Sequence, residues 1–195
     1  MIRLMKGPKG TKVRITVSRG GTLIPFDIIR DKIPVNCVDA SFMLNDTTGY
    51  IKLSKFTRTT YKEFTEAAES LVDKGMTRLI FDLRDNSGGY FDQSWKLANE
   101  FLERGDEVVY MEGLHRPRQN FDADGRGSLK NVLLSVLIDE GTASSSEIFS
   151  GAIQDNDRGV IVGRRSFGKG RNGQTDQVYR YGREKNSKAF QHCLQ

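Results

Sequence analysis

The chain lacks the features that mark membrane-spanning, metal-dependent and disulfide-rich proteins. No apolar run in its 195 residues approaches the ~18–20 residues that cross a bilayer. Its two cysteines, Cys37 and Cys193, and its two histidines, His115 and His192, form no cluster with metal-ligand spacing. We therefore expect two free thiols, no metal and no cofactor.

The chain also lacks an apolar leader and a clustered basic surface. Residues 1–10 are basic and contain few apolar side chains, so they do not read as a signal peptide. The formal net charge is +5, with +6 in residues 1–33, +3 in residues 171–195 and −4 between them. Because a nucleic-acid site needs its basic residues gathered on one face with groove-reading elements, we expect no nucleic-acid partner.

The first part of the chain predicts a β-hairpin. Val13, Ile15 and Val17 alternate with polar residues, Gly20-Gly21 can make a tight turn, and a second apolar run covers residues 23–29. Two strands alone are marginal in water. Pro34 marks a plausible boundary, so we predict a segment 1–33 that is separate from a larger domain, 34–170.

The larger domain predicts an alternation of strands and helices. Expected strands lie near 50–56, 79–83, 108–110, 132–138 and 160–162, and expected helices cover 60–74, 91–104 and 144–155. This alternation is typical of an α/β fold with parallel pairings. We expect a polar loop over 115–130 and an irregular, loosely packed tail over 171–195.

A serine-rich segment, residues 141–147, begins the last expected helix. A serine hydroxyl is a poor nucleophile until a neighbour removes its proton, and a helix start favours developing negative charge. Ser144 is therefore a candidate nucleophile, and Ser145 or Ser146 could take the exposed position instead. The pattern Ser144-x-x-Glu147 equally fits a capping box, in which Ser144 only caps the helix.

Two glycine-flanked segments could supply the rest of a hydrolytic site. Lys169 lies between Gly168 and Gly170, and a lysine acts as a base only where its environment favours the neutral form. Otherwise it is an ordinary surface lysine; the segment does not match a phosphate loop, because Gly170 stands where Ser or Thr is required. Gly88-Gly89 follows an apolar strand. Its N–H groups could form an oxyanion hole, or the two glycines could make only an ordinary strand-to-helix turn.

Together, the segments 82–89, 141–148 and 162–170 resemble the carboxyl-terminal processing, or tail-specific, proteases, which are Ser–Lys endopeptidases related to the tricorn core. The resemblance places the nucleophile on Ser144 and the base on Lys169, 25 positions later. It places the oxyanion donors on the N–H groups of Gly89 (or Gly88) and Ser145. It implies an α/β fold of the ClpP/crotonase-like type, protein or peptide substrates bound in extended form against a strand edge near residues 49–56, and a bacterial periplasmic or envelope location.

The resemblance extends to residues 1–33, which look like the end of the family's PDZ domain. It fails at position 173, where the family places a glutamine and this chain has Gly173; we assign the orienting role to the next residue, Gln174. The resemblance implies a serine endopeptidase that cleaves near protein C-termini. Because the PDZ-like segment is partial, the glutamine is shifted and an unpacked tail would leave Lys169 exposed, we expect weak activity that rises toward alkaline pH. The alternatives are a catalytically impaired fragment that acts as a peptide-binding scaffold and a crotonase-like acyl-CoA enzyme, which would give Lys169 no role.

Overall fold

The computed structural model describes residues 5–31, 36–113, 116–169 and 178–180. Contacts divide the chain into two units, Met1–Val35 and Asn36–Gln195, which are described separately. Among the described residues, no helix is long and apolar enough to cross a membrane.

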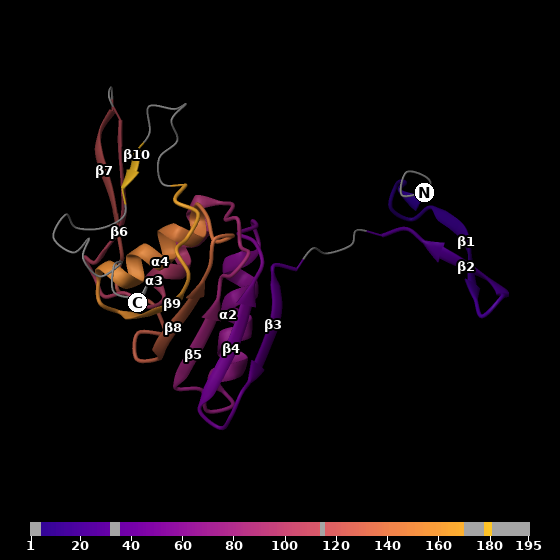
Figure 1. Ribbon diagram of the computed structural model, residues 1–195, viewed down its shortest axis with the longest axis horizontal. Coiled ribbons are helices and arrows are strands. Elements are labelled where there is room, and N and C mark those ends of the chain that lie inside the picture. Colours follow the sequence, from indigo (N-terminus) through magenta and orange to yellow (C-terminus); the bar gives the residue numbers. More distant parts are fainter. Residues whose placement is uncertain (1–4, 32–35, 114–115, 170–177, 181–195) are drawn as a thin grey trace. The chain divides into compact units, whose positions relative to one another are not determined.

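The first unit is an antiparallel hairpin of β1 (Lys12–Arg19) and β2 (Thr22–Ile29), shown in indigo in Figure 1. Gly20 and Gly21 form the turn, with φ values of 57° and 82° that favour glycine. Most side chains of both strands are exposed, including Leu23 and Ile29. The hairpin is held by its backbone ladder and by Asp27, which accepts hydrogen bonds from Arg14.

The second unit is built on a five-stranded sheet in the order β3-β4-β5-β8-β9. These strands are β3 (Val38–Met43), β4 (Thr48–Leu53), β5 (Arg78–Asp82), β8 (Leu133–Ile138) and β9 (Gly159–Gly163). The pair β3–β4 is antiparallel, and the other three pairs are parallel. The strand edge expected near residues 49–56 is not available over β4, because β3 and β5 pair with both of its edges.

Three helices pack against one face of this sheet (Figure 1): α2 (Thr60–Val72), α3 (Phe91–Asn99) and α4 (Ser145–Asp155). Alternate strand residues such as Ile51, Phe81 and Val136 are fully buried beneath them. The centre of the core is aromatic: Phe81 makes edge-on contacts with Phe64 of α2 and Phe149 of α4, at centroid distances of 5.0 and 5.1 Å. Such pairs add about 0.5–1.5 kcal/mol each beyond the burial of their area.

A smaller sheet, in the order β10-β6-β7, corrects two expectations from the sequence. The polar stretch after residue 115 is not all loop, because β7 (Arg116–Asp122) pairs antiparallel with β6 (Glu107–Gly113). Within the tail, β10 (Val178–Arg180) pairs with β6, so this part is not irregular. The remainder of the expected tail, residues 171–177 and 181–195, lies outside the described residues.

Candidate active site

The parallel strands bring three separate segments to one edge of the sheet. Asp82 at the end of β5 is in register with Leu137 of β8, and Leu137 is in register with Val162 of β9. The segments that leave the carboxyl ends of these strands therefore start side by side: residues 83–89, 139–144 and 164–169. Open parallel sheets usually bind ligands at this edge.

Ser144 occupies a strained position at the start of α4. Its backbone has φ 56° and ψ −116°, whereas an N-cap residue is normally extended and a positive φ is uncommon outside glycine. Its N–H donates to Glu147 Oε2 at 2.8 Å, so Ser144 and Glu147 are joined as the capping-box pattern predicts. The side chain is half-buried. Strain of this kind is concentrated at functional sites.

The Gly88-Gly89 turn lies directly against Ser144. A Cβ on Gly88 would stand 2.8 Å from the Ser144 Cβ and 2.8 Å from the Ser145 nitrogen, and a Cβ on Gly89 would overlap the carbonyl oxygen of Phe56. Both glycines have positive φ, 88° and 149°. The Ser145 hydroxyl donates to the Gly89 carbonyl at 2.9 Å, which fixes the turn to the helix start. Only glycine fits at either position.

The backbone amides around the turn differ in whether the described residues offer them an acceptor. The Gly88 N–H donates to Asn86 Oδ1 at 2.9 Å. By contrast, the N–H groups of Gly89 and Ser145 donate to no other residue in the described part of the chain. Because the Gly88 position stands against the Ser145 nitrogen, these two donors belong to one small region beside Ser144.

Glu147 ties the Lys169 segment to the start of α4. Its carboxylate is buried and accepts hydrogen bonds from the Ser166 hydroxyl at 2.7 Å, the Gly168 N–H at 2.7 Å and the Lys169 N–H at 2.9 Å. The Lys169 N–H shares the acceptor Oε2 with the Ser144 N–H, so the backbone nitrogens of Ser144 and Lys169 lie within about 5.7 Å of each other. The Lys169 side chain is exposed, and the neighbouring Phe167 is 67% exposed, so it does not shield the lysine from solvent.

The base of the 83–89 segment is anchored by a buried carboxylate. Asp82 accepts hydrogen bonds from the Arg84 guanidinium at 2.6 and 3.0 Å and from the Tyr50 hydroxyl at 2.6 Å. Burial alone would raise the pKa of Asp82, but these hydrogen bonds outweigh it and lower the pKa to about 2. The segment therefore starts from an ionised, fully hydrogen-bonded group.

The structure places the backbones of five of the six residues predicted for the site in one region: Ser144, Lys169, Gly88, Gly89 and Ser145. The sixth, Gln174, lies outside the described residues. The sequence analysis missed the bridging role of Glu147, which it treated only as part of a capping box. It also missed Asn86, although both residues stand within the segments that were singled out.

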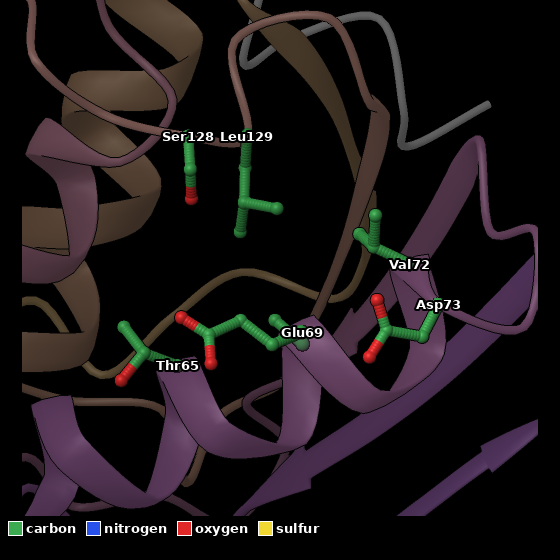
Figure 2. Close-up of a pocket in the computed structure, with 7 residues that line it drawn as sticks. Thr65, Glu69, Val72, Asp73, Ser128 and Leu129 are labelled. Carbon is green, nitrogen blue, oxygen red and sulfur yellow. The ribbon is translucent and has the colours of Figure 1, made fainter.

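A small cavity lies apart from this site. A cavity of about 140 Å³ opens between α2 and the Ser128–Leu129 loop, and Figure 2 shows Glu69 and Asp73 beside it. None of the predicted site residues lines this cavity. Across the described residues, no group of three or more His, Cys, Asp or Glu side chains could hold a metal ion.

The mixed α/β fold defines a class: solved processing proteases share it. A solved photosystem II D1 C-terminal processing protease superposes with a TM-score of 0.68 at 26% identity, over 90% of this chain and 52% of that one. A putative S41 protease from Bacteroides fragilis, 15% identical with a TM-score of 0.60, shares the fold.

Sequence comparisons then give the family. The model of peptidase family S41 matches residues 47–187, and the chain belongs to this family. The chain is 38% identical over 173 residues to a carboxyl-terminal-processing protease of Synechocystis sp., covering 85% of this chain and 40% of the relative. It is 35% identical over 170 residues to the carboxy-terminal processing protease CtpA of Bacillus subtilis, covering 87% and 36%. The chain thus spans about two fifths of the length of these relatives.

Proposed function

We propose that this chain is a serine endopeptidase that cleaves near protein C-termini, with Ser144 as nucleophile and Lys169 as general base. The observation that carries the proposal is the shared carboxylate oxygen of Glu147, which holds the backbones of both residues within about 5.7 Å. Ser144 Oγ attacks the scissile carbonyl carbon and gives its proton to neutral Lys169 Nζ. Lys169 then returns the proton to the amine as the C–N bond breaks, and water hydrolyses the acyl-enzyme.

Two amides that have no acceptor among the described residues support an oxyanion hole for this reaction. The N–H groups of Gly89 and Ser145 are the donors we assign, since Gly88 already donates to Asn86. Donors that are fixed before the reaction stabilise the developing negative charge without reorganising, and loss of one typically costs about 10²–10³ in rate. The start of α4 adds its own favourable field.

The N-terminal unit and the location complete the proposal. We assign the β1–β2 hairpin to a PDZ-like segment, and the core to the ClpP/crotonase-like form of the α/β fold, on the resemblance of these residues to the family. A periplasmic or envelope location follows from the same resemblance. Protein or peptide substrates would bind in extended form, at an edge other than that of β4.

The experiment is active-site labelling with a fluorophosphonate probe, combined with digestion of an unfolded protein substrate. Ser144→Ala and Lys169→Ala should each lower labelling and cleavage by several orders of magnitude. The nucleophile and its base act as one unit, so removing either one costs about as much as removing both. Ser150→Ala, on the same helix, and Lys74→Ala, at an exposed position, are the matched controls and should behave as the parent chain. Cleavage by Ser144→Ala at the parent rate would refute the assignment. Binding of peptides without any labelling of the parent would favour the scaffold alternative.

A further inference from the structure

Asn86 connects three parts of the candidate site. It is fully buried, and its side-chain Nδ2 donates to the Leu53 carbonyl at the end of β4, at 2.8 Å. Its Oδ1 accepts the Gly88 N–H at 2.9 Å. Its backbone carbonyl accepts from the Ala143 N–H at 2.9 Å and from the Ser146 hydroxyl at 3.0 Å, on either side of Ser144.

These contacts decide which amide of the glycine turn remains available. Of the two glycines, Gly88 donates its N–H to Oδ1, whereas the N–H of Gly89 has no acceptor among the described residues. A carboxamide can do this because it donates and accepts at the same time. Aspartate would keep an acceptor for Gly88, but it would place a carboxylate oxygen against the Leu53 carbonyl.

We propose that Asn86 is a positioning residue, which turns the Gly89 N–H into line with the Ser145 N–H so that both can donate to one substrate oxygen. The inference rests on the proposed peptidase function, and it adds the residue that selects Gly89 over Gly88 as the donor. Asn86 acts on both sides of the donor pair. Its side chain sets the turn, and its backbone carbonyl holds the helix start from which the Ser145 N–H projects.

The kinetic test uses Asn86→Asp, which is isosteric, and Asn86→Ser, which is neutral and smaller. Loss of a donor that acts in the transition state lowers kcat and leaves KM nearly unchanged. We expect kcat to fall by about 10²-fold or more in both variants, with KM within about threefold of the parent. The affinity of a peptide aldehyde, which forms a tetrahedral adduct, should fall in parallel with kcat.

Asn156→Asp is the matched control. Asn156 also donates from Nδ2 to backbone carbonyls, those of Glu107 and Ala152, but it stands at the far end of α4. A purely structural role for Asn86 predicts that its variants resemble this control, with a lower melting temperature and unchanged kcat and aldehyde affinity. That outcome overturns the inference while the parent chain still cleaves, so it leaves the proposed function intact.

A second measurement does not depend on activity. Amide hydrogen exchange followed by NMR should show that the Gly88 N–H is protected in the parent chain and the Gly89 N–H is not. In Asn86→Ser the Gly88 amide should lose its protection. Equal protection of the two amides in the parent chain, or an unchanged Gly88 amide in Asn86→Ser, refutes the inference even where no cleavage is detected.

Discussion

Replacing Glu147 tests the arrangement of the candidate site most directly. Its carboxylate accepts four hydrogen bonds, three from backbone N–H groups and one from the Ser166 hydroxyl. In Glu147→Gln one side-chain oxygen remains as an acceptor. The other is replaced by an NH₂ group, which cannot accept hydrogen bonds from the donors that face it. Two of the four hydrogen bonds are therefore lost, and hydrogen bonds to charged groups contribute about 1.5–3 kcal/mol each.

The whole loss does not appear in the stability of the domain. In this variant we expect the segment 164–169 to detach from α4 while the core of β5, β8 and the helices stays folded, and detachment would limit the cost of unsatisfied donors. We expect the free energy of unfolding to fall by about 1–3 kcal/mol. Labelling of Ser144 should fall at least tenfold, since the Lys169 segment is no longer held beside it.

The assay is a thermal melt of each variant, followed by fluorophosphonate labelling at a temperature where both remain folded. Glu140→Gln is the matched control, because Glu140 binds the same loop through Arg164 but on the exposed surface, where ion pairs contribute little. Equal melting temperatures and labelling rates for the two variants would show that Glu147 does not hold the site together.

Three further predictions concern charge, backbone and the N-terminal unit. Burial, with the charges of Glu107 and Asp157, raises the pKa of Asp155 from 3.8 to about 6, so the folded chain keeps a proton that the unfolded chain releases, and stability falls as the pH rises from about 4 to about 6. Asp155→Asn should therefore raise the free energy of unfolding by about 1–2 kcal/mol at pH 7.5, seen as a higher melting temperature, and leave both nearly unchanged at pH 4. An equal gain at both pH values contradicts this. Gly89→Ala should abolish labelling and destabilise the fold. Gly105 has φ 88° and open space around it, so Gly105→Ala should lower the free energy of unfolding by only about 1–2 kcal/mol, measured by calorimetry. Similar losses of stability in the two variants would refute the close approach of Gly89 to Phe56. Amides of β1 and β2 should exchange with deuterium faster than those of β5 and β8, because a two-stranded hairpin is marginal alone; equal protection would contradict that.

The elements predicted best from the sequence are those whose apolar spacing matches their burial. The helix that starts at Thr60 buries Phe64, Ala68 and Leu71 at helical spacing, and the apolar strand near 79–83 lies in the core, as expected. β7 was missed because its sequence is mostly polar, and it becomes a strand by pairing with β6. The helix expected over 91–104 ends at Asn99, and the next residue, Glu100, instead accepts hydrogen bonds from Tyr61 and Ser128.

The segments of the site could be predicted from the sequence, but the contacts between them could not. Glycines on both sides of a lysine and a serine-rich helix start are local patterns, so the three segments could be identified from the sequence. The bonds that join them are not local: Glu147 reaches across 22 positions to Lys169, and Ser146 across 60 to Asn86. A single sequence contains no signal for such partners, because any buried polar group would satisfy the same local pattern.

The order of the segments along the chain also has a consequence for biosynthesis. The Gly89 turn meets Ser145 across 56 positions, and β8, which leads to Ser145, pairs with β5, which leads to Gly89, so the chain must extend through β8 before these two amides can meet. The lysine segment follows β9, which pairs with β8 alone among the described strands of the sheet. Contacts of such long range form late in folding. If Ser144 and Lys169 act as proposed, a nascent chain that has not yet added β9 would hold the nucleophile without its general base, and it would therefore not cleave its own unfolded segments.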